Sequence, residues 1–457
     1  MVTKRLLEIA EKGVELSIEG GVDQAQVAAF LVDSALTRFA NSQIHQNVAT
    51  KRGGVTMKVV VDKRIGALMV NSLDERQIQE AAGKAVKIAK VSPPNKDFKS
   101  LPKPARWKPI RGAFDRNTAQ CDPDSRAEIV KEAIDTAHVK SRLVEAVAGS
   151  LSTGAYAFSV ANSLGVSAWA QITETSLTTT VISKSKGSQG FGSSEQHSRR
   201  IRDIDPRRTG DQAAEKSVSS INPKKIPTGD YEVVLSPRAV ASLLMFLGYI
   251  GFSAASYQDG QSFVKYNLNK QAFDPSLDVT DDPTDPKTLY AFPVDGEGVP
   301  KWRMHLIKTG KVSTRSICHN SFTAGKEKRK KSTGHALPPM YGFYSRPMPF
   351  NIVVAPGDAS VDEMVSETKH GIFVTRFHYT NPVEPAKVIL TGLTRDGTFL
   401  IENGEITKPT MNLRYTDSML SALKTIPLIG KSLEIVEEVT TPAMRLQKLR
   451  FTGITQF

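Results

Sequence analysis

The feature that most constrains the fold of this chain is residues 236–263, SPRAVASLLMFLGYIGFSAASYQDGQSF, its longest nearly uncharged segment. Apolar side chains recur here at helical spacing and also fill the opposite side, which predicts a helix that is apolar all round. Ser236 and Pro237 suit the N-cap and the first helical position. Gly248 and Gly251 each weaken a helix by about 1 kcal/mol and indicate that another backbone or a ligand comes close. The second half of the chain is therefore expected to contain one buried core helix.

Length and composition place the chain among folded proteins with more than one domain. It has 457 residues, 40% of them hydrophobic, so two or three domains are expected. No apolar run is long enough to span a membrane, and acidic residues interrupt the N-terminal segment where a signal peptide would be apolar. The two cysteines, Cys121 and Cys318, are far apart, which fits a reducing compartment rather than a disulfide framework. We therefore expect a cytoplasmic protein that does not enter the membrane.

The chain carries a net charge of +13, from 60 Lys+Arg against 47 Asp+Glu. Such a charge attracts polyanions or acidic peptides, although excess lysine also serves solubility. The densest basic run, from Lys326 to Lys331, could contact phosphates, or it is a solvated loop or one that meets an acidic subunit. No aromatic stacking pattern accompanies it, and the glycine-rich segment 187–194 lacks the ending of a phosphate loop. Nucleic acid is therefore not an expected partner.

Hydrophobic periodicity predicts an α+β fold whose N-terminal half consists of two α/β units with antiparallel meanders. The first unit, residues 1–91, has the order helix, three strands, helix. Residues 92–123 are rich in proline and predict a linker across the surface. The second unit, residues 124–222, contains two long antiparallel strands between two helices. Within it, residues 183–202 are rich in glycine, serine and basic residues, which predicts a mobile loop that could face a partner or substrate.

The remaining part, residues 226–457, alternates short β-prone runs with Asp-Gly, Asp-Pro and Asn-Gly turns. This pattern predicts a largely antiparallel β domain around the one buried helix. Apart from that helix, only residues 360–368 and 418–428 have a helical pattern. One acidic region is either a set of turns or a cation site, and it consists of Asp281, Asp282, Asp285, Asp295 and Glu297.

Two further groups of residues are candidates for chemistry or binding. Cys318 and His319 come nearest to a ligand pair, but adjacent residues of a strand point to opposite faces and would hardly chelate one ion. A Cys/His nucleophile would also need a base within hydrogen-bond reach. Arg376, His378 and Tyr379 end a β run, where they either pack as ordinary strand residues or line a chamber that pairs with an extended peptide. We regard these three as candidate substrate-binding residues.

Motifs in the second half of the chain show a family resemblance. They are SPRAVASLL, YQDGQSF, DDPTDP, FPVDGEGVPKWRMHLIKTGKV, STGHA, APGDASVDEMVSETKHGIFVTRFHY, LTRDGTFLIENGEI and PAMRLQKLRFTG. Together they resemble the TldD/PmbA family, and the likeness extends over nearly the whole chain. The resemblance implies one half of a zinc metallopeptidase, in which a TldD-type subunit binds the metal and a TldE (PmbA)-type partner does not. The pair is expected to form a hollow shell that admits unfolded peptides and trims precursor peptides such as microcins.

The resemblance also implies where zinc would bind. In the TldD-type subunit the corresponding helix carries His-Glu-x-x-x-His, because two imidazoles hold the ion while the carboxylate takes a proton from bound water. A cysteine near the C-terminus is the third ligand there. Here Leu244 and Tyr249 occupy the histidine positions and Met245 the glutamate position, and no cysteine follows Cys318. Because none of these side chains is expected to bind zinc at neutral pH, we expect a TldE-type subunit with no metal and no catalytic residues of its own.

We therefore expect this chain to complete a metallopeptidase in which a TldD-type partner supplies the zinc. Its own contribution would be half of the wall, substrate contacts and stability, in a heterodimer with that partner and with an unfolded peptide as substrate. The alternative is a homodimeric, non-catalytic protein that binds peptides or modulates another protein, including the gyrase link attached to the family. Polyanion binding is a third reading that depends on charge alone. Whether the chain has activity of its own is left open.

Overall fold

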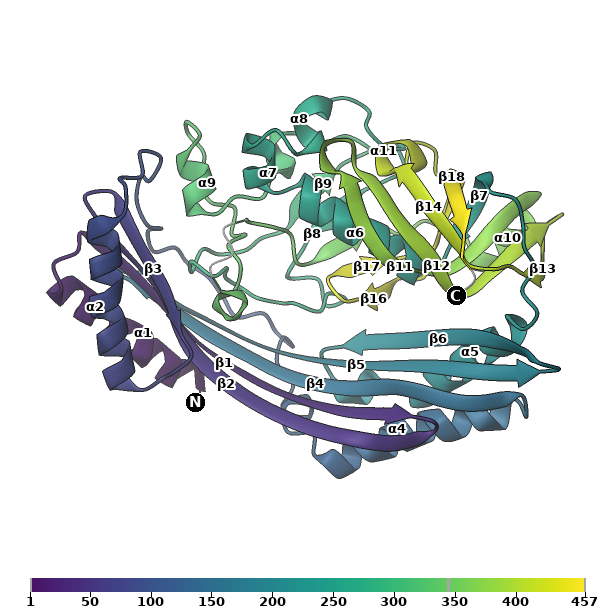
Figure 1. Ribbon diagram of the computed structural model, residues 1–457. Coiled ribbons are helices and arrows are strands. Elements are labelled where there is room, and N and C mark those ends of the chain that lie inside the picture. Colours follow the sequence, from purple (N-terminus) through teal and green to yellow (C-terminus); the bar gives the residue numbers. More distant parts are fainter. Residues whose placement is uncertain (1, 343–345, 456–457) are drawn as a thin grey trace.

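The computed structural model describes residues 2–342 and 346–455, and its largest element is one long, curled sheet (Figure 1). The six strands are antiparallel in the order β3-β2-β1-β4-β5-β6. They are β1 (Gln24–Ala40), β2 (Gln43–Val61), β3 (Arg64–Val70), β4 (Val144–Asn162), β5 (Ser167–Ser185) and β6 (Ser188–Ser198). Because β1 pairs with β4, the strands of the two expected α/β units form one continuous sheet.

Helices cover one face of this sheet and the C-terminal half of the chain covers the other (Figure 1). The helices are α1 (Val2–Glu19), α2 (Glu75–Val91), α4 (Pro123–Lys140) and α5 (Pro206–Ser219). Successive side chains of a strand point to opposite faces. Accordingly Val27 and Ala29 of β1 pack with α1 and α2, whereas Phe30 shares a core with Phe292 and Met340. The sheet is thus buried from both sides along this stretch.

Strand β6 overturns the sequence-based expectation for residues 183–202. The prediction of a mobile loop there is wrong, because β5 and β6 form a hairpin whose turn, Lys186 and Gly187, has φ values of 48° and 82°. The glycines serve close packing rather than mobility. A Cβ on Gly192 would lie 2.2 Å from the carbonyl oxygen of Ala213 in α5. Only a residue without a side chain allows strand and helix to approach this closely.

The C-terminal half contains two sheets. One has the order β16-β17-β10-β8-β9, and the other β11-β7-β18-β14-β12-β13, with β15 beside β18. Since β11 also pairs with β12, five strands of the second sheet close into a ring. The strands are β7 (Gly229–Leu235), β8 (Val279–Asp281), β9 (Met304–Ile307), β10 (Ile352–Val354), β11 (His370–Glu384), β12 (Ile389–Glu402), β13 (Glu405–Pro409), β14 (Leu413–Ser418), β15 (Leu428–Ile429), β16 (Glu434–Val436), β17 (Val439–Thr441) and β18 (Met444–Ile454).

The α+β class is therefore confirmed, with a β-rich C-terminal half. Its strand pairs are mostly antiparallel, but β7 and β11 are parallel, as are β10 and β17. The remaining helices are short: α3 (Arg116–Ala119), α7 (Ala254–Gln258), α8 (Phe263–Asn267), α9 (Ser321–Gly325), α10 (Val361–Ser366) and α11 (Met419–Ala422). Of these, α10 and α11 fall within the two segments with a helical pattern. Among the described residues, no helix is long and apolar enough to cross a membrane.

The predicted core helix is α6 (Pro237–Gly251), which is shorter than residues 236–263. Ser236 caps it by accepting a hydrogen bond from the third following backbone N–H. The helix ends at Gly251, where a Cβ would lie 2.2 Å from the ring of Phe263. Likewise, a Cβ on Gly248 would lie 2.7 Å from the side chain of Ile352. The two glycines therefore make room for neighbouring side chains, and the expectation of a backbone or a ligand at these positions is wrong.

Candidate functional site

Helix α6 is not buried on all sides, contrary to the sequence-based prediction. The three positions that correspond to a zinc motif, Leu244, Met245 and Tyr249, lie in different surroundings. Leu244 is 2% exposed within the apolar core, whereas Tyr249 is 38% exposed. Met245 lines a cavity of about 160 Å³. A hydrocarbon, a thioether and a phenol do not hold zinc at neutral pH. Within residues 2–342 and 346–455, no three His, Cys, Asp or Glu side chains are grouped so that they could hold a metal ion.

The cavity beside Met245, here called the α6 cavity, joins parts of the chain that are far apart in sequence. Strand β6 of the curled sheet, helix α6, strand β11 and the hairpin of β16 and β17 all contribute to its wall. Its charged lining residues are Glu195, Arg238, Arg376 and Glu437. Sequence analysis missed Glu195, because it lies in the segment that was predicted to be a mobile loop.

An ion pair between Glu195 and Arg238 connects the sheet to α6 at this cavity. Nη2 of Arg238 lies 2.6 Å from Oε2 of Glu195, and Nη1 donates to the Ser193 hydroxyl at 2.9 Å. Burial alone would raise the pKa of Glu195, but the His197 imidazole and the Arg238 charge outweigh burial and lower this pKa to about 2. In the described part of the chain, Nε of Arg238 is buried without a hydrogen-bond partner. The ion pair is thus fixed and charged, with one donor left over.

The three candidate substrate-binding residues on β11 are not equivalent in the structure. Arg376 lines the α6 cavity, but its Nε donates to Asp396 at 2.6 Å. His378 is half-buried, and burial together with the charge of Arg376 lowers its pKa. Tyr379 is 74% exposed and has a φ of 50° at an irregularity in the pairing with β12. Only Arg376 borders the cavity, and a substrate contact by any of the three stays a prediction.

Half-buried carboxyls with raised pKa values lie between the sheet and the C-terminal half. The hydroxyl of Tyr156 on β4 donates to Glu174 on β5, and Tyr290 also hydrogen-bonds to Glu174. Burial raises the pKa of Glu174. At the turn between β16 and β17, burial raises the pKa of Glu438 to about 7. Sequence reasoning could not find this group, because its members come from four separate segments and none belongs to a motif.

The acidic region between Asp281 and Glu297 is not a cation site. Asp282, Asp285 and Asp295 each accept the backbone N–H two residues later at 2.8–2.9 Å, so the prediction of turns is confirmed for these three. Asp281 is fully buried and takes hydrogen bonds from two backbone N–H groups. Asp282, Asp285 and Asp295 therefore hold their own turns, whereas Asp281 holds the distant backbone of Phe350 and Asn351.

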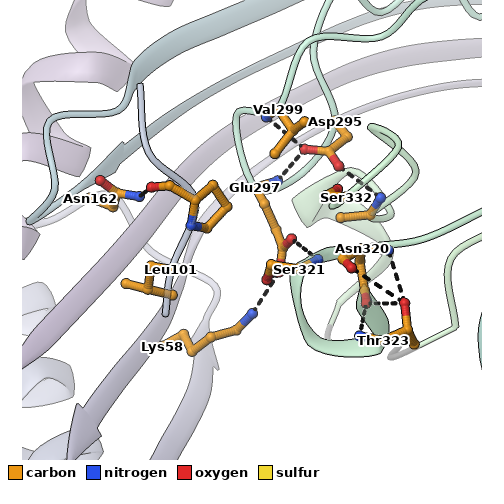
Figure 2. A network of polar contacts seen from close by, with 12 residues as sticks. Lys58, Leu101, Asn162, Asp295, Glu297, Val299, Asn320, Ser321, Thr323 and Ser332 are labelled. Atoms are coloured by element: carbon orange, nitrogen blue, oxygen red, sulfur yellow. Dashed lines mark hydrogen bonds and ion pairs between the residues drawn. The ribbon is translucent and has the colours of Figure 1, made fainter. Parts of the chain in front are cut away.

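Glu297 fastens the C-terminal half to the curled sheet (Figure 2). Its Oε1 lies 3.1 Å from Nζ of Lys58 on β2 and accepts from the Ser321 hydroxyl at 2.7 Å, while its Oε2 accepts from the Ser321 backbone N–H at 2.8 Å. Burial would raise the pKa of Glu297, but the charge of Lys58 and the hydrogen bonds from Ser321 outweigh burial and lower it. This network is a structural anchor whose acceptors are occupied.

Cys318 and His319 do not combine into a nucleophilic pair. Cys318 is fully buried, and burial raises the pKa of its thiol well above the ordinary value. The thiolate that a nucleophile or a zinc ligand requires is therefore scarce at neutral pH. His319 lies at a separate pocket that is described below.

The sequence of this chain resembles known proteins over most of its length. Models of the PmbA/TldA metallopeptidase central domain and C-terminal domain match residues 117–221 and 228–453. The chain belongs to the PmbA/TldD metallopeptidase family. Two curated relatives of this PmbA/TldD chain are the Metalloprotease PmbA homolog of Haemophilus influenzae and Metalloprotease PmbA of Escherichia coli O157:H7. They are 25% and 23% identical, and both alignments cover 98% of this chain and 96% of the relative.

Solved structures share the fold of this PmbA/TldD chain. TldE from Thermococcus kodakarensis has a TM-score of 0.88 at 18% identity, and the match covers 97% of this chain and all of that one. A putative modulator of a DNA gyrase from Thermotoga maritima has a TM-score of 0.85 at 23% identity, over 97% and 99% of the two chains. The family, the fold and the residues on α6 together are consistent with a PmbA/TldE-type subunit.

Proposed function

We propose that this chain is the non-zinc-binding subunit of a TldD/TldE-type metallopeptidase complex that trims or degrades unfolded and precursor peptides. The observation that carries the proposal is the chemistry of α6. Leu244, Met245 and Tyr249 stand where a zinc-binding subunit needs two imidazoles and a carboxylate. Leu244 is also enclosed by the apolar core, so the helix is built for packing at that position. The sequence supplies no cysteine after Cys318 as a further ligand.

In this proposal the zinc-bearing partner supplies the activated water, and the residues of this chain hold the peptide. The α6 cavity presents the charged side chains of Arg238, Arg376 and Glu437. Next to Glu437, Glu438 has a pKa of about 7 and can donate as well as accept a hydrogen bond. Such groups suit a peptide backbone, which presents N–H and C=O groups in alternation. Arg376, His378 and Tyr379 would extend these contacts along the end of β11.

The test is to purify the chain alone and together with a zinc-bearing TldD-type subunit. Zinc content is measured by mass spectrometry, association by size-exclusion chromatography with light scattering, and cleavage on a disordered precursor peptide. We expect no stoichiometric zinc and no cleavage from the chain alone, and association, zinc and cleavage from the mixture. One zinc per chain together with turnover in the partnerless protein would overturn the proposal.

A control separates the contribution of each subunit. In the partner, the glutamate of the His-Glu-x-x-x-His motif is replaced by glutamine, which removes the proton acceptor and keeps the metal ligands. The mixture should then still associate and contain zinc but no longer cut the peptide. Cleavage that persists in this mixture would place the catalytic groups in this chain, which contradicts the proposal.

A second candidate function is a homodimeric, non-catalytic protein that binds peptides or modulates another protein. The observation in its favour is that a similar solved structure, from Thermotoga maritima, is described as a putative modulator of a DNA gyrase. The same measurements distinguish the two functions. This alternative would be favoured if the chain dimerises with itself and binds the peptide. It would also have to fail to associate with the zinc subunit and to support cleavage.

A further inference from the structure

A strongly basic pocket of about 770 Å³ lies next to β9, the edge strand of the five-stranded sheet. It shares no lining residue with the α6 cavity. Among the described residues that line it, none is Asp or Glu and five are cationic: Arg303, Lys308, Lys311, Arg315 and Lys330. We call it the β9 pocket. Of the basic run from Lys326 to Lys331, only Lys330 lines the β9 pocket. The pocket is therefore distinct from the basic run that stands out in the sequence.

Most cations of the β9 pocket are not neutralised by the protein. Arg303 lies 3.6 Å from Asp282 and is the one with a carboxylate close by. For Lys308, Lys311 and Arg315, the described residues provide no ion pair. Lys308 and Lys311 exchange backbone hydrogen bonds of 2.9 and 3.0 Å, which keeps these like charges near each other. A concave site of one charge sign raises the local concentration of the opposite ion, here an anion.

His319 adds a buried polar side chain to the wall of the β9 pocket. It is only 2% exposed, and within the described chain the geometry gives neither ring nitrogen a hydrogen-bond partner, although the Glu327 charge and the Thr323 backbone act on the ring. Buried polar atoms without partners are rare and costly, so they mark places where a group is missing from the protein alone. Burial lowers the pKa of His319 to about 4, and the ring is therefore neutral at pH 7, with one N–H donor and one acceptor.

An aromatic ring stands beside the cations. The Trp302 side chain is 47% exposed and lines the pocket next to Arg303. The other two tryptophans pack against each other, with ring centroids 5.3 Å apart. An exposed aromatic ring beside Lys and Arg side chains is a suitable platform for a nucleotide, since a base can stack on the ring while the cations contact phosphate oxygens. A carboxylate-bearing peptide would use the charges but would leave the indole face without a planar partner.

We propose that the β9 pocket binds a nucleotide. The phosphate groups contact Lys308, Lys311 and Arg315, the base stacks on Trp302, and His319 donates its N–H to a ligand oxygen or accepts from a ligand amine. This binding activity is separate from the proposed peptidase role, since the pocket and the α6 cavity have no residue in common.

The test titrates ATP into the full chain at low ionic strength, with calorimetry for affinity and tryptophan fluorescence for the stacked ring. We expect saturable binding below about 1 mM that weakens as salt is added. Arg315→Gln and Lys311→Gln should each weaken binding roughly tenfold, which is the usual effect of losing one charge-assisted contact. Lys84→Gln, at an exposed lysine on α2, is the matched control and should leave the affinity unchanged.

A second variant tests the nucleotide class of the ligand. Trp302→Ala should weaken ATP by about tenfold, as expected for loss of base stacking, and should leave the affinity for inorganic phosphate unaltered. The Trp302 ring is half-exposed, so the variant is expected to fold. The proposal is overturned if ATP does not saturate, if Arg315→Gln binds as tightly as the natural chain, if Trp302→Ala is without effect, or if a phosphoserine peptide binds as tightly as ATP.

Discussion

Two buried ion pairs tie the C-terminal half to the curled sheet, and they have opposite polarity. At β2 the sheet supplies the cation, Lys58, and the C-terminal half the carboxylate, Glu297. At β6 the sheet supplies the carboxylate, Glu195, and α6 the cation, Arg238. The side chains are 24% and 5% exposed in the first pair and 10% and 16% in the second, so burial alone does not distinguish them.

What differs between the two ion pairs is how completely their hydrogen bonds are filled. Ser321 donates twice to Glu297, and this carboxylate is fully occupied inside the protein. At β6, by contrast, Nε of Arg238 has no hydrogen-bond partner in the described chain, and the pair borders the α6 cavity. Similar burial therefore accompanies two different arrangements: the β2 pair has its hydrogen bonds filled, while the β6 pair keeps one buried donor unfilled beside the cavity.

The largest effect is expected for Lys58→Met, which tests whether the β2 pair anchors the fold. The substitution leaves the Glu297 carboxylate buried without its cation, which should lower the free energy of unfolding by about 3–5 kcal/mol. Urea denaturation at pH 7 measures the change. The double variant Lys58→Met/Glu297→Gln should recover more than half of the loss, because no buried charge remains. A loss below about 1 kcal/mol for Lys58→Met would contradict the anchor assignment.

At the other pair, Arg238→Met should cost about 2–4 kcal/mol, somewhat less because His197 still lies 3.7 Å from Glu195. The folded-state pKa of Glu195, about 2, is below its unfolded value. Its contribution to stability is therefore complete above the unfolded pKa and is lost as the pH falls towards 2. Acid denaturation followed by circular dichroism should show this loss in the natural chain and a weaker pH dependence in the variant. Equal pH dependence in both proteins would contradict the assignment.

Glu438, which belongs to neither ion pair, makes the stability of the fold depend on pH in the opposite direction to Glu195. Its folded-state pKa of about 7 is above its unfolded value. Between these two values the folded chain binds more protons than the unfolded chain, so Glu438 makes stability fall as the pH rises. Glu438→Gln should be more stable than the natural chain by about 1–3 kcal/mol at pH 8 and nearly equal to it at pH 4. Thermal unfolding at both pH values tests this, and a variant equally stable at pH 8 would contradict it.

The smallest effect is expected for Lys51→Met, which provides the baseline. Lys51 pairs with Asp33 across the same sheet, but the two side chains are 65% and 48% exposed. Exposed ion pairs contribute about 0–1 kcal/mol, so the free energy of unfolding should change by no more than this. If Lys51→Met costs as much as Lys58→Met, burial does not explain the strength of the β2 pair.

The parts of this fold that depend on local patterns could be predicted from the sequence. The order helix, three strands, helix in residues 1–91 and the long strands β4 and β5 followed from apolar periodicity, which each segment contains in itself. Strand β6 was missed, because Gly190 and Gly192 have the composition of a flexible loop and are required by the backbone of α5 only once that helix is packed. Composition cannot distinguish these two uses of glycine.

The site was predictable in one respect and hidden in another. Leu244, Met245 and Tyr249 could be assigned by comparison with a motif, because a zinc motif is contained within six consecutive residues. The contacts that build the α6 cavity and the anchor connect distant positions, such as Lys58 and Glu297, which are 239 residues apart. Nothing in the local sequence marks such partners, since each is an ordinary charged residue until the fold is complete.

The pairing of β1 with β4 also has a consequence for synthesis of the chain. Strand β1 finds its first neighbour, β2, immediately, but its second neighbour does not begin until Val144, after the proline-rich crossing. On the ribosome, the middle of the future sheet is therefore an open edge for as long as translation takes to reach that point. Open strand edges invite pairing with other chains. The nascent protein thus passes through an aggregation-prone stage whose duration depends on the speed of elongation. Slower translation of the proline-rich segment between β3 and β4 would lengthen this stage.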